Sequence, residues 1–113
     1  MGRKLLTKQI VWLSFDLGLR GDYEGLYGWL DQHEAKECGD GVAFLDYPHD
    51  GETLPEMLKA DLVKSVKFDN KSRIYVIWRN GRQIMKGRFL VGSRRAAPWI
   101  GMAPGLVTED DEG

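Results

Sequence analysis

Residues 10–17, with the sequence IVWLSFDL, decide the fold that we expect for this chain. Their side chains alternate between two rows: Val11, Leu13, Phe15 and Leu17 form one, and Ile10, Trp12, Ser14 and Asp16 form the other. This alternation predicts a β-strand. Since both rows contain apolar side chains, we expect helices to cover one face of the strand and another cover to lie on the second face.

The first helix is expected directly after this strand. Gly18 and Gly21 end the strand, and Asp22 is a good N-cap for a helix that runs to about His33. The apolar residues of this segment recur at helical spacing, and they are Tyr23, Leu26, Tyr27 and Leu30. Each glycine inside a helix costs about 1 kcal/mol relative to alanine. We therefore expect another backbone to pack closely against the two that this helix contains, Gly25 and Gly28.

A second strand and a second helix follow a turn over residues 37–41. The strand is expected over residues 42–47 and a loop over residues 48–52. Thr53 and Glu56 have the spacing of a capping box, which predicts that a helix begins at about residue 54 and continues to residue 66. Its apolar stripe is expected to be Leu54, Leu58, Leu62 and Val66.

The segment RIYVIWRNGRQIMKGRFLV, residues 73–91, predicts a β-hairpin. Residues 73–79 alternate strongly, with Ile74, Val76 and Trp78 on one face and Tyr75 and Ile77 on the other. Asn-Gly, which follows at residues 80–81, is the preferred dipeptide of a tight two-residue turn. We therefore expect residues 83–91 to form an antiparallel partner strand.

The element order is strand, helix, strand, helix, strand, strand, which defines an α+β fold with a four- to five-stranded sheet. Two strand–helix–strand crossovers of right-handed sense place both helices on one face of the sheet. The opposite face then presents Trp12 and either Trp78 or Tyr75, which water should not contact. A second copy of the chain is the simplest cover for this face, and the alternative is the chain's own arm, residues 93–102.

Length and composition favour a single cytoplasmic domain without membrane contacts. The chain has 113 residues, which we divide into a domain with a C-terminal arm over residues 1–102 and a flexible acidic tail over residues 103–113. Its only cysteine, Cys38, excludes an intramolecular disulfide. No signal peptide is recognisable, and no apolar run approaches the roughly 20 residues of a membrane helix.

Charge is distributed unevenly along the chain. Four acidic residues lie in the last five positions, and without them the chain has 16 basic and 13 acidic residues. Residues 79–95 contain basic side chains and no acidic one: Arg79, Arg82, Lys86, Arg88, Arg94 and Arg95. This stretch is either a phosphate-binding surface or an edge strand that its charges protect from aggregation. Beside it, Trp78 and Trp99 either stack on bases or pack in a core or interface.

The residues with the clearest chemical potential lie at the end of the first strand. Asp16 is on the face that we expect to meet a second copy, and two symmetry-related carboxylates would hold one Mg²⁺. Such an ion activates water and neutralises phosphate, and Ser14 points the same way to orient a ligand. Alternatively, Asp16 caps the following loop. Residues 18–21 of that loop either hold a phosphate with Arg20 or form a plain turn.

Several short motifs together carry a family resemblance over residues 10–92. They comprise Phe15-Asp16-Leu17 before a Gly/Arg loop, a helix with Tyr27 and Leu30, Gly41-Val42-Ala43-Phe44, Ser72-Arg73-Ile74-Tyr75-Val76, and a strand ending in Val91-Gly92. With these motifs the chain resembles the small CRISPR adaptation proteins of the Cas-two family and the related VapD toxins and SinR-like proteins. It departs from their pattern at Gly41, where serine is common, and at Phe15, where tyrosine is common.

This resemblance implies a ferredoxin-like fold, a homodimer, and Mg²⁺-dependent cleavage of RNA or DNA. The family's metal-binding aspartate matches Asp16, its basic loop residue matches Arg20, and its last strand, which crosses to the partner sheet, matches residues 85–91. We therefore expect a nucleic-acid-interacting homodimer that acts as an endonuclease. The alternatives are a non-catalytic scaffold for nucleic acid or protein, and a small-nucleotide-binding module, in a defence or toxin-type system.

Overall fold

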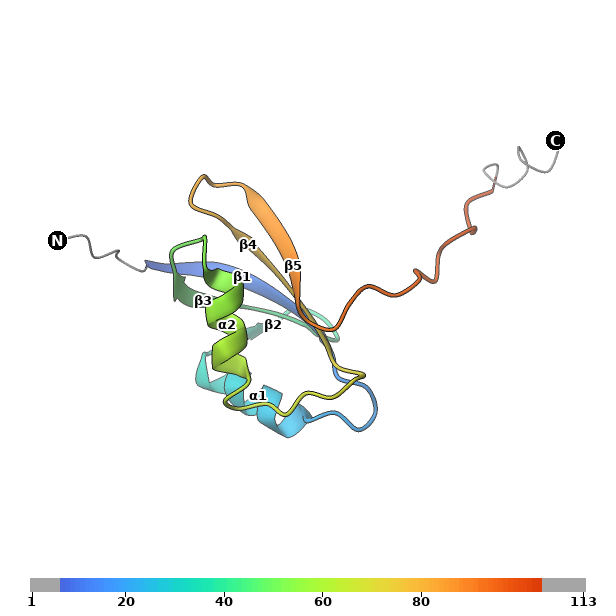
Figure 1. Cartoon of the computed structure of the whole chain (residues 1–113), viewed down its shortest axis with the longest axis horizontal. Helices are drawn as coiled ribbons and strands as arrows, with labels where there is room; N and C mark the ends of the chain where they lie inside the picture. The colour runs from blue at the N-terminus through green and yellow to red at the C-terminus, as the bar shows by residue number, and fades with distance from the viewer. Residues whose placement is uncertain (1–6, 105–113) are drawn as a thin grey trace.

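A computed structural model describes residues 7–104 of the chain (Figure 1). Within this range five strands and two helices follow one another: β1 (Thr7–Asp16), α1 (Tyr23–Gln32), β2 (Lys36–Glu37), β3 (Val42–His49), α2 (Leu54–Leu62), β4 (Arg73–Arg79) and β5 (Met85–Val91). The expected strands and helices are therefore present, and the short β2 is an addition. The acidic tail that we predict lies outside the described residues from position 105 onward.

The strands form one antiparallel sheet in the order β2-β3-β1-β4-β5, so β1 is the central strand. The α+β class and the five-stranded sheet with two helices are confirmed. The prediction of two crossovers was wrong in one respect. β1 and β3 are antiparallel neighbours, so α1 is an excursion between two adjacent strands. Only the connection through α2 joins parallel strands, β3 and β4, which flank β1 on either side.

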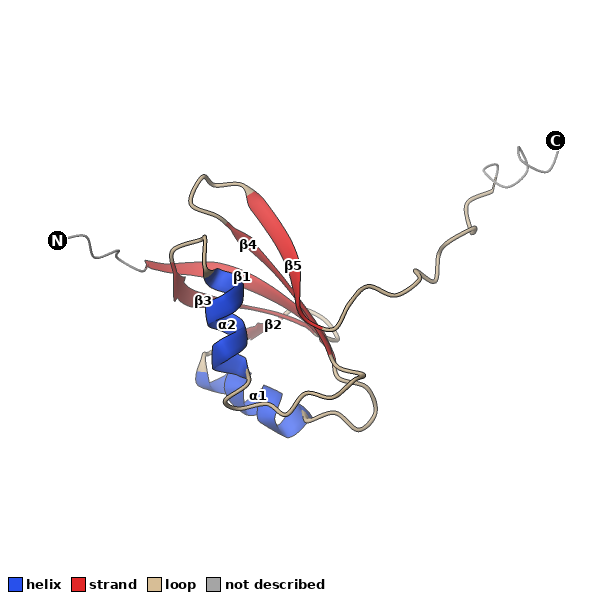
Figure 2. Ribbon diagram, in the orientation of Figure 1, coloured by secondary structure: helices blue, strands red, loops and turns tan. Residues whose placement is uncertain are grey.

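One face of the sheet is covered by both helices. The buried row of β1 contains Val11 and Leu13, which have no solvent exposure. Tyr47, in the buried row of β3, shows that both helices pack on this face. Its ring lies 6.2 Å from that of Trp29 in α1, and its hydroxyl donates a 3.0 Å hydrogen bond to Asp61 in α2. In Figure 2, α2 crosses in front of the sheet.

The first helix begins as predicted, but its buried face differs. The Asp22 side chain accepts a 2.9 Å hydrogen bond from the Gly25 amide and thus caps the helix. Trp29 is buried, whereas Tyr27 is 54% exposed, so including Tyr27 in the apolar stripe was wrong. Close packing is found at Gly25, where an added Cβ would lie 2.4 Å from the Ser65 carbonyl oxygen. No atom lies within 4 Å of such a Cβ at Gly28.

The second helix has a different cap from the predicted capping box. The Thr53 hydroxyl donates to the carboxylate of Asp50 at 3.0 Å, and the Thr53 amide donates to the same carboxylate at 2.8 Å. The Thr53 side chain therefore makes no cap hydrogen bond to α2. The helix ends at Leu62, four residues before the predicted end, yet Val66 is buried with the rest of the predicted stripe.

The hairpin between β4 and β5 has a wider loop than Asn-Gly predicts. The Asn80 side-chain oxygen accepts hydrogen bonds from the amides of Arg82 and Ile84, at 2.8 and 3.0 Å. Asn80 and Ile84 close the loop through a 2.9 Å backbone bond, and Gln83 adopts a positive φ of 66°. These contacts favour a three-residue loop with a left-handed last residue. As a result β5 begins at Met85, two residues later than predicted.

The opposite face of the sheet, which we call the open face, has no helix on it. Trp12 lies across from Phe44 of β3 and Ile77 of β4 in the strand register, and the Trp12 and Phe44 rings are 4.9 Å apart. Tyr75 shares this face. Trp78 points to the covered face, where its indole N–H donates to the Gly51 carbonyl oxygen at 2.9 Å. Of the two alternatives in the sequence, the structure therefore places Tyr75 beside Trp12.

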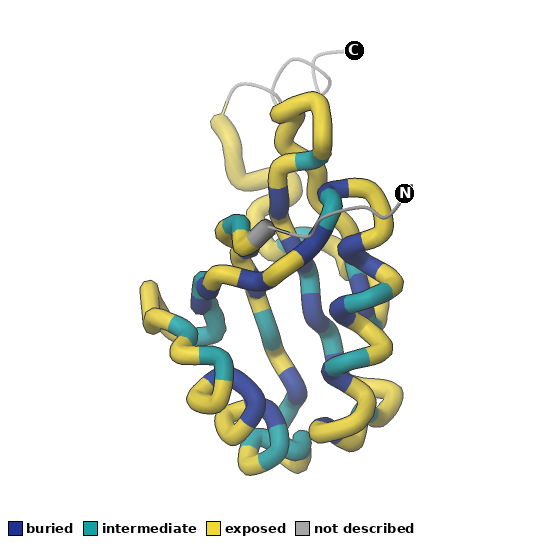
Figure 3. The backbone as a smooth tube through the Cα atoms, turned by 90° about the vertical axis from the view of Figure 1, so that its left-hand side faces the viewer, coloured by how far each residue is buried: buried dark blue, intermediate teal, exposed yellow. Residues whose placement is uncertain are grey.

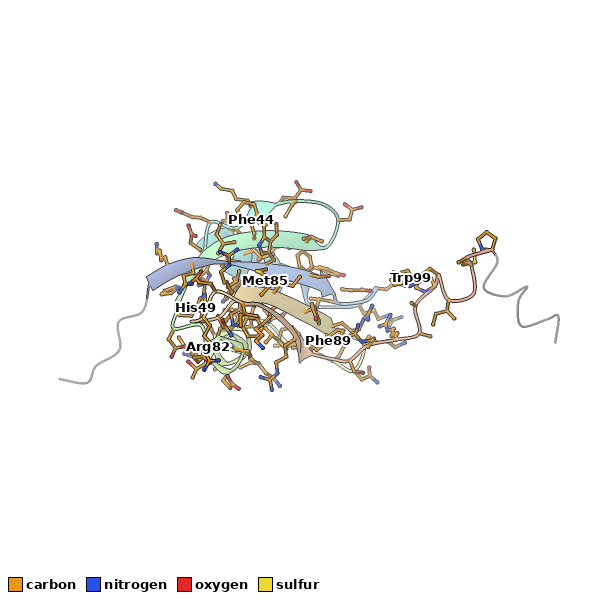
Figure 4. The ribbon with its side chains drawn as sticks, turned by 90° about the horizontal axis from the view of Figure 1, so that it is seen from above. Phe44, His49, Arg82, Met85, Phe89 and Trp99 are labelled. Carbon is orange, nitrogen blue, oxygen red and sulfur yellow. The ribbon has the colours of Figure 1, made fainter. Side chains whose placement is uncertain are left out.

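The arm, residues 93–102, does not cover the open face. It runs away from the sheet beyond β5 (Figures 1 and 4) and is exposed along nearly all of its length (Figure 3). Its three large apolar side chains are exposed by 72% at Trp99, 71% at Ile100 and 72% at Met102. The alternative in which the chain's own arm covers its sheet is therefore not what this structure contains.

Candidate nucleic-acid interface

Asp16 ends the central strand, at the edge where β1 and β4 run side by side. It lies opposite Arg73 in the strand register, and Ser14 lies opposite Tyr75. The Asp16 side chain is exposed, and its Oδ1 accepts a 3.0 Å hydrogen bond from the Gly18 amide. Asp16 therefore caps the loop, as one of the sequence interpretations holds, while its carboxylate stays accessible to solvent.

Two clefts meet at Asp16, and together we call them the Asp16 cleft. The larger has a volume of about 710 Å³ and the smaller about 330 Å³. Loop residues form the larger cleft: Asp16, Leu17, Gly18, Leu19, Arg20, Asp69, Asn70, Lys71 and Arg95. The open face and the start of the arm form the smaller one: Ser14, Phe15, Asp16, Arg73, Tyr75, Phe89 and Arg94.

Positive charge dominates this cleft. Five cationic side chains from four segments line it: Arg20, Lys71, Arg73, Arg94 and Arg95. The only carboxylates among its lining residues are Asp16 and Asp69. Within residues 7–104, none of the five cations forms an ion pair with a carboxylate. Their charges are therefore available to an anionic ligand, and neighbouring cations in a concave site reinforce one another's potential.

Asp69 is held by the loop before β4, and its negative charge offsets part of the positive charge of the cleft. Its carboxylate accepts hydrogen bonds from the Lys71 amide at 2.9 Å and from the Ser72 hydroxyl at 3.1 Å. These bonds, that from the Lys71 amide first, lower the pKa of Asp69 from its usual value. The carboxylate is thus an internal acceptor that shapes the loop and carries Lys71 to the cleft.

An aromatic pair lies beside the cations in the smaller cleft. The rings of Tyr75 and Phe89 meet edge to face, with centroids 4.9 Å apart. The Arg94 guanidinium lies 5.7 Å from the centre of the Phe89 ring. The buried Nε of Arg73 has no hydrogen-bond partner among the described residues. Aromatic faces next to free guanidinium groups suit a ligand that has both flat rings and negative charge.

The N-terminus of α1 does not supply a free phosphate cradle. The Gly25 amide donates to Oδ1 of Asp22, and the Lys67 amide donates to Oδ2 at 2.9 Å. These hydrogen bonds, that from Lys67 first, lower the pKa of Asp22, so a negative charge already occupies this helix end. The loop over residues 18–21 therefore borders the Asp16 cleft chiefly through Arg20, while its backbone forms a turn.

The structure gathers only part of the predicted site residues. Ser14, Asp16, Arg20, Arg94 and Arg95 all line the Asp16 cleft. The remaining four residues of the basic stretch lie elsewhere. Arg79 and Arg82 are at the hairpin end of the sheet, and Lys86 and Arg88 are on the covered side of β5, where Arg88 lies 3.6 Å from Glu56 of α2. The stretch over residues 79–95 is thus not one surface.

Two cleft residues, Lys71 and Arg73, are absent from the sequence-based set. Lys71 lies in a turn and Arg73 begins β4, positions at which a basic residue commonly faces solvent. The strand register identifies Arg73 as a residue of the cleft, because the antiparallel pairing of β4 with β1 places Arg73 opposite Asp16. Sequence alternation predicts each strand but leaves their relative shift open.

The described residues of a single chain do not supply a complete set of ligands for Mg²⁺. Among the described residues, no group of three or more His, Cys, Asp or Glu side chains is arranged to hold a metal ion. The accessible carboxylate of Asp16 is a suitable oxygen ligand, and Mg²⁺ is often bound by one or two carboxylates together with water and substrate phosphates. The donor set therefore fits Mg²⁺ only when a second carboxylate or a bound phosphate completes it.

Comparisons with known proteins add no assignment: no family model, no curated protein and no solved structure matches the chain. No helix within residues 7–104 is long and apolar enough to cross a membrane.

Proposed function

We propose that this chain binds nucleic acid, with the Asp16 cleft receiving the phosphate backbone. The observation that supports this is the gathering of five cations from four separate segments around one cleft, none of which is ion-paired within residues 7–104. Phosphate contacts supply most of the affinity in nucleic-acid binding. The Tyr75–Phe89 pair offers bases an aromatic surface next to those cations. A compact anion without rings would leave that surface unused.

The proposed assembly is a ferredoxin-like homodimer. The antiparallel sheet with two helices on one face is compatible with that fold, and the open face offers an apolar surface for a second copy. In such a dimer the two-fold axis passes near the Asp16 end of the sheets. Two Asp16 carboxylates then approach each other, and the cations of the two clefts together form one continuous basic surface for a nucleic-acid molecule.

The experiment is a binding titration with labelled single-stranded RNA and duplex DNA, read by fluorescence anisotropy at several salt concentrations. Arg73→Gln is expected to weaken binding to nucleic acids of every sequence, because one phosphate contact is lost. The slope of log affinity against log salt concentration should fall by about 1 in magnitude. Arg82→Gln is the matched control, since it removes the same charge at the far end of the sheet. An affinity that does not depend on the salt concentration, or an equal loss of affinity in the two variants, would refute the proposal.

A second candidate function is Mg²⁺-dependent cleavage of the bound strand, favoured by an accessible carboxylate within a cationic cleft. Mg²⁺ held by Asp16 and its counterpart would supply an activated water and neutralise phosphate. The residues of this chain would position the strand: Arg20 and Arg73 hold phosphates, and Ser14 orients a ligand. Asp16→Asn is expected to abolish cleavage and retain binding. Full cleavage by this variant would exclude Asp16 from the chemistry.

If neither polymer binds, a small nucleotide remains the ligand to test. Binding of a free nucleoside triphosphate that is lost in Arg20→Ala would favour the small-nucleotide module. Binding of polymer without any cleavage in the presence of Mg²⁺ would favour the non-catalytic scaffold.

A further inference from the structure

The open face changes character along its length. At the Asp16 end it is polar and charged, as described above. At the hairpin end it is apolar, with Ile10 47% exposed, Trp12 39% exposed and Met85 53% exposed. These three side chains border a hollow of about 350 Å³, completed by Gln9, Trp78, Arg79 and Gln83. The hollow is wide enough for one large aromatic side chain, and nothing in the described chain fills it.

The arm carries side chains that match such a hollow. Trp99, Ile100 and Met102 lie within four positions of one another and are each more than two-thirds exposed. Two local backbone hydrogen bonds shape this part of the arm, from the Ile100 amide to the Ala97 carbonyl oxygen and from the Met102 amide to the Trp99 carbonyl oxygen. Figure 4 shows Trp99 far out along the arm, well separated from Met85 and Phe44.

The arm leaves the sheet at the Asp16 end. Gly92, its anchor, packs against β4: an added Cβ there would lie 2.5 Å from the Ser72 carbonyl oxygen and 2.8 Å from Cγ of Arg73. In the homodimer proposed above, this end lies next to the two-fold axis. Each arm therefore starts beside the second copy and points away from its own sheet.

The lengths agree with a crossing. Trp99 lies seven residues after Gly92, which spans up to about 23 Å of extended chain. The hollow lies near Ile10, six residues from Asp16 along β1, or about 20 Å. An arm that begins at the axis thus reaches the hollow of the other copy.

We propose that the arms exchange: Trp99 of each copy inserts into the Ile10–Trp12–Met85 hollow of a second copy. This inference rests on the proposed homodimer and adds the segment that closes it. A second copy is the occupant that the structure favours because every copy carries both the hollow and the arm, so a two-fold pair satisfies both at once. Arg79, which borders the hollow, is positioned to pack on the indole face.

The test uses cross-linking between chains of different mass, in a Cys38→Ser background. One chain carries Ile100→Cys, which leaves the neighbouring Trp99 intact, and the other, with a mass tag, carries Ile10→Cys. A short bismaleimide joins thiols that lie close together. A mixed cross-link is expected as the main product. Val63→Cys replaces Ile10→Cys in the matched control, because Val63 is equally exposed but lies on the helix side, and it is expected to give none.

A chain that carries Ile100→Cys and Ile10→Cys together distinguishes exchange from self-coverage. If this chain cross-links only within itself, or if the control pair reacts as well as the test pair, the exchange is refuted. Light scattering supplies a second readout: Trp99→Ala is expected to weaken dimerisation at least tenfold, whereas Val63→Ala, which removes an exposed apolar side chain on the helix side, should not. Neither measurement contains nucleic acid, so a failure of the proposed nucleic-acid binding leaves these outcomes unaffected.

Discussion

The two faces of the central strand differ in composition and in use. On the covered face Val11 and Leu13 are fully buried, whereas on the open face Ile10 and Trp12 keep 47% and 39% of their surface exposed. The covered row is apolar at every second position from Val11 to Leu17, whereas the open row combines Ile10 and Trp12 with the polar Ser14 and Asp16. The difference shows that a single chain needs only one of the two rows to fold. The apolar side chains of the open face are therefore free to serve recognition.

The largest difference between the faces is expected in stability. Leu13→Ala leaves a cavity in the core and should lower the free energy of unfolding by about 3 kcal/mol. Trp12→Ala, on the open face, should cost less than about 1 kcal/mol in the monomer although it removes more atoms. Urea denaturation at low protein concentration measures both values. Similar losses in the two variants would show that the open face also belongs to the core.

A packed side and an open side can also be compared within α1, at Gly25 and Gly28. The expected changes in stability are smaller here and have opposite signs. Gly25→Ala places a Cβ against the Ser65 carbonyl oxygen and should destabilise the fold by about 2 kcal/mol. Gly28→Ala projects into open space and should stabilise it by up to about 1 kcal/mol through helix propensity. Thermal unfolding of the two variants tests this. A stabilising Gly25→Ala would mean that α1 and the segment after α2 are not closely packed.

The smallest expected effect concerns pH and the covered row of β3, which ends in His49. The buried His49 ring accepts a 2.8 Å hydrogen bond from the Gly51 amide at Nδ1, so its proton resides on Nε2. Burial lowers the pKa of His49 from 6.5, and the nearby Asp50 only partly opposes this. Below pH 6.5 the unfolded chain therefore binds one more proton than the folded chain, and stability falls as the pH falls.

For one proton this fall is at most about 1.4 kcal/mol per pH unit. His49→Gln, whose side-chain oxygen can still accept from Gly51, should flatten the decline between pH 6.5 and 5. His33→Gln keeps His49 and serves as the control. The carboxylates of Asp22 and Asp69, whose pKa values are lowered, act in a separate pH range. Their protonation removes stability only as the pH falls below about 4. An unchanged decline in His49→Gln would contradict this account.

Much of the fold was predictable because local patterns and tertiary packing agree. The alternation in residues 10–17 and 73–79 is the alternation of burial in β1 and β4, and the leucine stripe after Thr53 is buried as predicted. Predictions were wrong where a neighbouring side chain changed the local geometry. Asp50 engages Thr53 in place of the capping box, and the Asn80 side chain widens the hairpin loop.

The site was predictable only in part. Asp16 and Arg20 follow from a strand end and its loop, which sequence alone reveals. Lys71 and Arg73 reach the cleft because β4 pairs with β1 at one particular register, and a two-residue slip would remove them. Arg82 lies near Arg94 in sequence but not in space, since a strand of seven residues separates its two ends by about 20 Å. Arg88 lies within the same strand but points to its covered side, toward Glu56 of α2.

The hydrogen bond from the Trp78 indole to Gly51 has a consequence for how β5 is held. Gly51 has a φ of 84°, and an added Cβ would lie 2.6 Å from the Gly81 nitrogen, so the loop before α2 packs closely against the hairpin. At the other end of β5, an added Cβ at Gly92 would lie 2.5 Å from the Ser72 carbonyl oxygen. This edge strand is therefore fixed at both ends, and the wall that it gives the Asp16 cleft stays in register with the rest of the sheet.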